Sequence, residues 1–191
     1  MSKISEINQT LQASARANKY RVSFTFPAAV GGVTPLREID ILAKAATAPG
    51  KEIGVIELLN QGRKLIIPGD TTFDNNWPVT FYLGENHALR IDMLKWLNAC
   101  DNFHKNRHSG KPSEIFVDLI VEQLDSAEKA TAVYTIHGSF PTNVGDVSYG
   151  DDSENTVGEF EVNFAYTDWV IGKGEEDDYS LISPTLNPTA L

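Results

Sequence analysis

Apolar and polar residues alternate with a period of two along much of this chain. In Tyr20–Phe26 the even positions are apolar and the odd positions are polar, and Trp77–Leu83 places four apolar side chains on one face. In Leu36–Lys44 one face is apolar and the other carries Glu38 and Asp40. Because successive side chains of a strand point to opposite faces, this period predicts half-buried β-strands at all three places.

Turn-forming residues divide the other strand-like segments. Asn60-Gln61-Gly62 separates Lys51–Leu59 from Arg63–Ile67, and a short glycine-containing connection of this kind suits a β-hairpin. The alternation within these two segments is poor. Three further strands are predicted nearer the C-terminus: Ser113–Leu124, Ala130–Phe140 and Glu159–Trp169.

The period changes after Asn86. Apolar side chains then recur at the spacing of one helix face, and Asn86 is a suitable N-cap residue. These apolar positions are Leu89, Met93, Trp96, Leu97 and Cys100. The chain is therefore predicted to be mainly β within the α+β class, with two packed antiparallel sheets that form a small barrel or sandwich and one flanking helix.

Composition divides the 191 residues into three parts. Residues 1–17 are predicted to be an N-terminal arm or helix, 18–170 a single β domain, and 171–191 an acidic, proline-containing tail outside the core. Residues 145–158 are rich in glycine, aspartate, serine and asparagine and are predicted to be a loop. One domain suits this length, because single cores typically occupy about 100 to 200 residues.

One predicted strand has a face that core packing does not require. In Ser113–Leu124 the odd positions from Ile115 onward are apolar, whereas Glu114, Asp118 and Glu122 share the other face with three large apolar side chains. Spaced carboxylates among apolar groups fit a wall that a neighbouring subunit partly buries. An ordinary outer face with some exposed apolar atoms explains the pattern equally well.

The charge of the chain argues against electrostatic binding of nucleic acid. Sixteen Lys and Arg residues against 26 Asp and Glu residues give a formal net charge of −10, whereas neutralising phosphates needs clustered cations. Cys100 is the only cysteine, so no intramolecular disulfide is expected. The sequence has no signal-peptide or membrane-span pattern, and a soluble protein made in the cytoplasm is expected.

A metal-dependent hydrolase is the catalytic alternative. His104 and His108 have the i, i+4 spacing that places two imidazoles on one helix face, and Asp101 lies nearby. The lysine and arginine between the two histidines disfavour a bound dication. The chain is therefore predicted to be no enzyme and to have no catalytic residue, metal site or cofactor.

A series of ordered sequence blocks resembles the tail tube protein of contractile-tailed bacteriophages. The blocks follow one another in the expected order, and it is their order, rather than any single block, that suggests the family. They are Ala17–Val22, Ala46–Gly50, Arg63-Lys64 with Pro68–Asp74, Leu83–His87, Gly110–Pro112, Phe140–Gly145 and Glu159–Val162.

The resemblance implies a two-sheet protomer that assembles into hexameric rings, which stack into a tube around a channel for the genome. The implied partners are further copies of the chain, the tail sheath protein, the tape measure protein, and the baseplate and tail terminator proteins. DNA passes through without specific binding, and no membrane is bound. The implied location is the virion tail, after synthesis and assembly in the host bacterial cytoplasm.

Two alternatives within the structural class stay open. Type VI secretion systems and other contractile injection particles have tube proteins of the same fold, so the chain also fits the tube of such a particle. A baseplate protein that initiates the tube is the second alternative.

The resemblance turns two sets of residues into candidate contacts. The acidic residues are candidates for the channel lining or the ring interface, where like-charge repulsion keeps DNA away within a Debye length of about 8 to 10 Å. They are Glu38, Asp40, Glu114, Asp118 and Glu122. Turns are also predicted at Ala48–Gly50 and at Pro141–Gly145, where proline and glycine interrupt the strands. These two turns are candidates for loop contacts between subunits, through Ala48, Pro49, Gly50, Pro141, Asn143 and Gly145.

Overall fold

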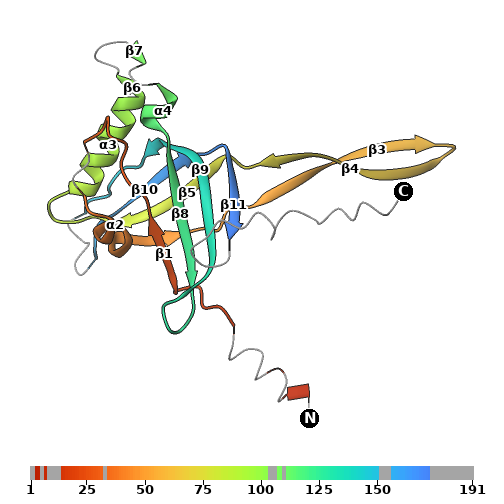
Figure 1. Ribbon diagram of the computed structural model, residues 1–191, viewed down its shortest axis with the longest axis horizontal. Helices are drawn as coiled ribbons and strands as arrows, with labels where there is room; N and C mark the ends of the chain where they lie inside the picture. Colours follow the sequence, from red (N-terminus) through yellow and green to blue (C-terminus); the bar gives the residue numbers. More distant parts are fainter. Residues whose placement is uncertain are drawn as a thin grey trace.

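Two antiparallel sheets that share one long strand form the body of the molecule, and a two-stranded hairpin projects from it (Figure 1). This computed structural model describes residues 3, 4, 7, 14–31, 34–102, 107, 108, 111–150 and 156–172. The first sheet has the order β1-β8-β9-β11 and the second has the order β9-β10-β5-β2. The strands of the body are β1 (Tyr20–Ser23), β2 (Ala43–Ala46), β5 (Asn76–Tyr82), β8 (Val117–Leu124), β9 (Ala130–Val144), β10 (Glu159–Ala165) and β11 (Asp168–Gly172).

Helices and two smaller strand pairs complete the described part of the chain. The projecting hairpin consists of β3 (Lys51–Asn60) and β4 (Arg63–Phe73), and β6 (Asp101–Asn102) pairs with β7 (Arg107–His108). The helices are α2 (Leu36–Leu42), α3 (Ala88–Cys100) and α4 (Pro112–Ile115).

The core lies between the two sheets and α3. Trp96 on α3 is fully buried, and its ring centroid lies 5.9 Å from that of Phe164 on β10. Its indole Nε1–H donates to the Ile115 carbonyl at 2.9 Å, so the one polar atom of the side chain is satisfied. The alternation predicted near the C-terminus is confirmed, because four side chains at every second position are buried: Phe160, Val162, Phe164 and Tyr166.

Strand β9 bends at Gly138 and so belongs to both sheets. Gly138 has a φ of +63°, and a Cβ at this position would lie 2.9 Å from the Thr167 hydroxyl oxygen. Only glycine adopts this backbone conformation next to such a close neighbour without strain. Up to Ser139 the strand pairs with β8, and beyond it the strand pairs with β10. The sheets form a sandwich that is not closed into a barrel, because β1, β2 and β11 each keep an edge without a partner strand among the described residues.

The strand predicted over Leu36–Lys44 is wrong, because its first seven residues form α2 and only the end joins β2. Leu36, Ile39 and Leu42 are three residues apart, which fits a helix face as well as alternation fits a strand. Ile39 is buried, whereas Ile41, expected on the same face, is 66% exposed. The helical period therefore decides which side chains reach the core.

This correction moves several of the acidic residues. Glu38 and Asp40 lie on a helix and not on a strand. The strand predicted from residue 113 begins only at Val117, and Glu114 lies on the short helix α4. Asp118 and Glu122 do lie on β8, as predicted.

The turn predicted at Pro141–Gly145 is wrong as well. β9 continues through Val144, with Pro141 opposite Phe164 and Asn143 opposite Asn163 on β10. Beyond Ser139 the strand pairs with β10 alone among the described residues, so the missing N–H of the proline fits a strand edge. Neither Asn143 nor Gly145 has the positive φ that the predicted turn would use.

The remaining elements differ from the predictions in their bounds. The helix expected after Asn86 is confirmed as α3, and the Asn86 side-chain oxygen accepts from the Ala88 N–H at 3.1 Å, although His87 occupies the N-cap position. The strand predicted over Glu159–Trp169 divides at Tyr166-Thr167 into β10 and β11. Most of the predicted arm over 1–17 and nearly all of the tail predicted over 171–191 lie outside the described residues.

Candidate assembly surfaces

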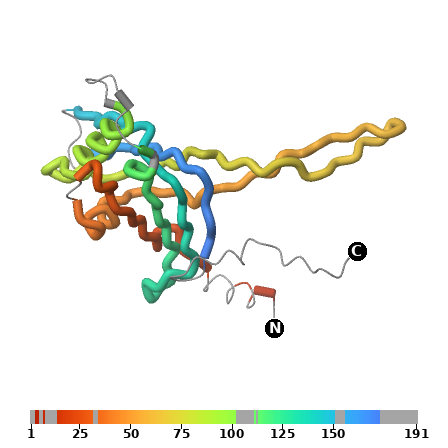
Figure 2. The backbone as a smooth tube through the Cα atoms, turned by 45° about the horizontal axis from the view of Figure 1, so that its top comes forward, coloured from red at the N-terminus to blue at the C-terminus, as the bar shows by residue number. Residues whose placement is uncertain are grey.

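The β3–β4 hairpin extends from the body as a two-stranded ribbon (Figures 1 and 2). The 10 residues of β3 span about 33 Å at a rise of about 3.3 Å per residue. Two indole groups hold its base: Trp169 Nε1–H donates to the Gly50 carbonyl at 3.0 Å, and Trp77 Nε1–H donates to the Thr47 carbonyl at 2.6 Å. The ribbon therefore leaves the body at a fixed point beside β11.

The two faces of the hairpin differ in chemistry. Residues directly opposite each other share a face, so Ile56 with Ile67 and Leu58 with Leu65 make one face apolar. The other face mixes apolar and charged side chains: Val55, Glu57, Leu59, Lys64, Ile66 and Pro68. We call these the apolar face and the mixed face of the hairpin.

Large apolar side chains are exposed along the whole hairpin, from 36% exposure for Ile67 to 83% for Leu59. No third strand pairs with the ribbon within the described part of the chain. An isolated two-stranded ribbon is at best marginally stable in water, and a contiguous exposed apolar surface marks an interaction site. The hairpin is therefore the strongest candidate here for a protein–protein contact.

The first sheet ends in two edges without partner strands. Among the described residues β1 pairs with β8 alone and β11 pairs with β9 alone. An edge strand presents a row of unpaired N–H and C=O groups that can pair with another chain. Because the two edges lie at opposite ends of the sheet, one edge of a first copy can meet the other edge of a second copy, which is a head-to-tail arrangement.

The outer face of the first sheet is the one turned away from the core. The core-facing side is apolar and includes the fully buried Leu119 and Ile136. The strand register places four charged residues on the outer face, one cation and three carboxylates: Arg21, Asp118, Glu122 and Asp168. This face is therefore net negative.

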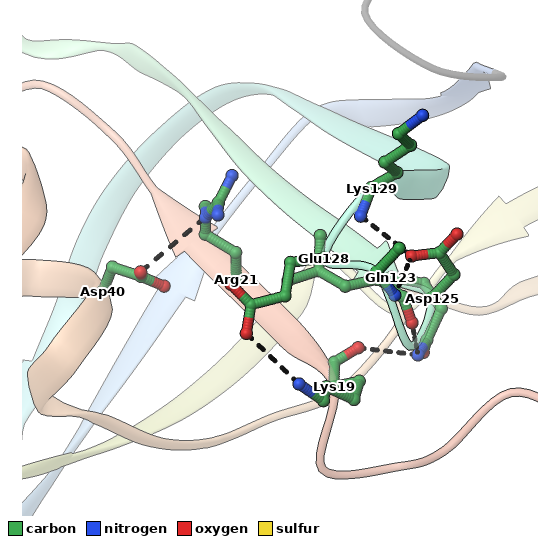
Figure 3. Close-up of polar contacts among 9 residues, drawn as sticks. Lys19, Arg21, Asp40, Gln123, Asp125, Glu128 and Lys129 are labelled. Atoms are coloured by element: carbon green, nitrogen blue, oxygen red, sulfur yellow. Dashed lines mark hydrogen bonds and ion pairs between the residues drawn. The ribbon is translucent and has the colours of Figure 1, made fainter.

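Arg21 pairs with two of the predicted acidic residues at once. Its Nη1 lies 3.1 Å from Oε2 of Glu122 on the neighbouring strand, and its Nε lies 3.7 Å from Oδ2 of Asp40 on α2. Figure 3 shows the guanidinium group reaching toward Asp40. One cation therefore compensates two carboxylates and ties α2 to the first sheet.

The turn between β8 and β9 is fixed to the chain before β1 (Figure 3). Asp125 Oδ1 accepts from the Lys129 N–H at 2.9 Å, which closes the turn. Gln123 Nε2 donates to the Lys19 carbonyl at 2.7 Å, and Lys19 Nζ lies 3.3 Å from Oε1 of Glu128. These contacts set the position from which the chain enters β1.

Asp118 also has partners for both carboxylate oxygens. Oδ1 accepts from the Gly138 N–H at 3.1 Å, and Oδ2 lies 3.3 Å from Nδ1 of His137. None of Asp40, Asp118 and Glu122 is therefore a free carboxylate, although Asp118 and Glu122 share the outer face of β8.

The other predicted contact residues lie on separate elements. Half-buried Glu38 is on α2 and exposed Glu114 is on α4, so the five acidic residues do not form one strip along a strand. Ala48, Pro49 and Gly50 lead into the hairpin, and the Gly50 carbonyl accepts from Trp169. Their roles in assembly stay predictions.

Gly145 lies where β9 ends against β10. Its N–H donates to the Glu161 carbonyl at 2.7 Å, and its own carbonyl accepts from Nη2 of Arg90 on α3 at 3.2 Å. Pro141 is buried and Asn143 is exposed on the same stretch. These residues are thus held within the protomer, and their contact with a second subunit also stays a prediction.

The metal-site alternative falls largely outside the described residues, because His104 is not among them and the side chain of His108 is not described. Within the described part of the chain, no group of three or more His, Cys, Asp and Glu residues could hold a metal ion. Burial raises the pKa of the Cys100 thiol to about 11, so the thiol is protonated at neutral pH. No helix in the described ranges is long and apolar enough to cross a membrane.

An open two-sheet body, an apolar arm that reaches beyond it and, among the described residues, unpaired edges at both ends of one sheet are typical of a structural protein that contacts further protein chains. Residues 15–172 match the phage tail tube protein family, and the chain belongs to this family.

Two curated relatives and one solved structure show how far the similarity extends. The chain is 28% identical over 151 residues to the tail tube protein of Serratia phage KSP90, covering 79% of this chain and 85% of that one. It is 34% identical over 130 residues to tail tube protein gp19 of Enterobacteria phage T4, covering 66% and 77%. A chain of the anti-feeding prophage baseplate, solved by cryo-EM, has the same fold with a TM-score of 0.62, 13% identity and coverage of 85% and 98%.

The sequence interpretation missed two features of these surfaces. The first is the exposed apolar face of the hairpin. The poor alternation of Lys51–Leu59 indicates such a ribbon, because a strand that packs on no core does not need one apolar and one polar face. The pairing of Arg21 with Glu122 joins residues 101 positions apart, and the sequence contains no signal for it.

Proposed function

We propose that six copies of this chain close into a ring and that the rings stack into the tail tube of a phage. Membership of the tail tube family supports the tube, and the anti-feeding prophage baseplate, which has the same fold, is described as six-fold symmetrised. The relatives named above are phage tail tube proteins, which favours a phage tube over a secretion tube or a tube-initiating baseplate protein.

Ring closure uses the free edges of the first sheet. β1 of one copy pairs with β11 of the next, so that six sheets become one continuous wall without an unpaired edge. The sheets then face the channel with their outer face, because the opposite face packs into the core. The observation that supports this most is the presence of an unpaired edge at each end of one four-stranded sheet.

The channel wall repels DNA only moderately. The outer face has three carboxylates and one cation, and Arg21 partly compensates Glu122 and Asp40. A net negative wall still disfavours adhesion of phosphates within about a Debye length. DNA therefore passes without specific binding, and the chain has no catalytic role.

The hairpin reaches a neighbouring copy. Burying one exposed leucine or isoleucine in such a contact contributes about 1.5 to 3 kcal/mol, and the hairpin exposes several. The tail sheath, tape measure, baseplate and terminator proteins are the further partners, and assembly takes place in the cytoplasm of the host bacterium.

Electron microscopy of the purified protein tests this function. We expect rings and tubes at high protein concentration, and we expect Leu58→Glu combined with Leu65→Glu to stay folded by circular dichroism but to form no tubes. A wild-type protein that stays monomeric at every concentration, with neither rings nor tubes, overturns the proposal.

A further inference from the structure

A groove runs along the second sheet at the opposite end of the molecule from the hairpin. Its floor is the outer side of β5 and β10, and its wall is formed by residues 146, 148–150 and 156–158. Its volume is about 750 Å³. The chain segment that follows β9 begins at this end of the molecule, whereas the hairpin projects from the other end (Figures 1 and 2).

The groove combines exposed apolar side chains with carboxylates. Tyr149 is 78% exposed and Val157 is 60% exposed, although both line a concave surface. Asp146 and Glu161 line the groove, and neither forms an ion pair within the described residues; Glu161 accepts a hydrogen bond from the Asn163 amide at 3.1 Å. Glu159 also lines the groove, but it is paired with Lys44. Asp146 and Glu161 are therefore the groove carboxylates that lack a cation, and the exposed side chains of Tyr149 and Val157 lack an apolar partner among the described residues.

The apolar face of the hairpin offers apolar side chains and a cation. Its four aliphatic side chains lie in two directly opposed pairs, Ile56 with Ile67 and Leu58 with Leu65. Arg63 lies opposite Asn60 at the tip of the same face and has no ion-pair partner among the described residues. On the mixed face, by contrast, Lys64 is already paired with Glu57.

We propose that this groove receives the β3–β4 hairpin of a second copy of the chain, with the apolar face of the hairpin on Tyr149 and Val157 and with Arg63 beside Asp146 and Glu161. The inference rests on the proposed function and names the receiving surface within it. The charges are complementary, because the hairpin supplies the cation Arg63 and the groove supplies the carboxylates Asp146 and Glu161. A second copy is the occupant because the hairpin and the segment after β9 that begins the groove wall lie at opposite ends of the molecule (Figures 1 and 2), which is the arrangement that a head-to-tail contact needs.

Gly145 fixes the point at which the groove wall begins. That residue is hydrogen-bonded to the Glu161 carbonyl and to Arg90, so the start of the groove wall is held at both its N–H and its carbonyl. A Cβ on Gly145 would lie 3.0 Å from the Glu161 carbonyl oxygen, so the wall approaches β10 here more closely than a residue with a side chain allows without a shift. The wall is thus anchored where the incoming hairpin would press on it.

Disulfide trapping in assembled particles tests the contact. Leu58→Cys and Val157→Cys are introduced together in a Cys100→Ser background. The control pair is Leu59→Cys with Val157→Cys in the same background, because Leu59 lies on the mixed face. We expect oxidation to link copies through the Leu58 pair at least about tenfold faster than through the control pair, because a disulfide forms only when the Cα atoms lie within about 7 Å. Equal rates, or no link in intact tubes, overturn the proposed groove.

Charge reversal gives an independent readout. Arg63→Glu should reduce the yield of tubes at least about tenfold, which corresponds to a loss of one strong ion-pair contact at each repeat, and Glu161→Lys in the same chain should restore it. Lys64→Glu is the matched control and should leave assembly closer to wild type. Tubes that form normally with Arg63→Glu overturn the groove and leave the tail tube function intact, whereas a wild-type chain that never assembles overturns the function itself.

Discussion

Arg21 on β1 and Glu122 on β8 lie directly opposite each other in paired strands, and their side chains form an ion pair of 3.1 Å. The same guanidinium lies 3.7 Å from Asp40 on α2. The acidic face expected from the sequence is therefore partly compensated by a cation from another strand. Arg21 thereby links the edge strand β1 to both β8 and α2.

Replacing Arg21 with glutamine should destabilise the protomer only modestly. The Arg21 side chain is 42% exposed, so solvent screens the pair and we expect a loss of about 0.5 to 1 kcal/mol in the free energy of unfolding, measured with urea. Lys19→Gln, at the more exposed pair with Glu128, is the control and should cost less. A loss well above 1 kcal/mol would mean that Arg21 has a larger role in the fold than its contacts indicate.

Asp92 should matter far more to stability than the acidic residues of the sheet. Its buried carboxylate accepts from the Thr34 N–H at 3.1 Å and from the Thr34 hydroxyl at 2.7 Å, and it pairs with Lys95. Asp92→Ala leaves these donors without an acceptor, so we expect a loss of about 2 to 4 kcal/mol in urea unfolding.

The control for Asp92 is the exposed Asp146. Asp146→Ala should change the free energy of unfolding by less than about 0.5 kcal/mol. Similar losses for the two variants would contradict the role assigned to the Thr34 contact.

Gly138→Ala should weaken the bend of β9. An alanine there must adopt a φ near +63° and its Cβ would meet the Thr167 hydroxyl at 2.9 Å, so we expect a loss of about 1 to 3 kcal/mol in thermal or urea unfolding. Gly50→Ala has open space around the new Cβ and should be nearly neutral. A neutral Gly138→Ala would show that β9 does not need glycine to serve two sheets.

Cys100 should react slowly with alkylating reagents in the folded protein. Burial raises the pKa of its thiol from 9.0 to about 11, which lowers the thiolate fraction at pH 8 about 100-fold. Because the folded state favours the neutral thiol, this group adds no pH dependence below the unfolded pKa and reduces stability as the pH rises above it. Iodoacetamide labelling of native and urea-unfolded protein measures the effect, and equal rates would contradict it.

The strands that face the core could be predicted because burial forces a pattern on them. Every second residue from Phe160 to Tyr166 is buried, and Trp77, Val79 and Phe81 repeat this on β5. Where neither face of a strand is buried, the sequence has no reason to alternate. The hairpin alternates poorly because both of its faces are exposed in the protomer, and β4 runs on to Phe73, six residues beyond its predicted end at Ile67.

Two errors came from local signals that fit more than one structure. Leu36, Ile39 and Leu42 satisfy a helix face, while the alternation around Asp40 satisfies a strand, and packing of Ile39 into the core decides for the helix. Pro141 is typical of a turn, but a strand edge tolerates its missing N–H equally well. The pairing with β10 decides for the strand, and a local sequence pattern does not show which strand will be the partner.

A cryo-EM reconstruction of assembled wild-type particles tests the central claim most directly, because it shows which edges meet. The account predicts six copies in each ring, β1 of one copy hydrogen-bonded to β11 of the next, and the face of β8 with Asp118 and Glu122 turned toward the channel. A particle in which the β1 and β11 edges stay apart, or in which that face of β8 lies on the outside of the tube, would contradict it.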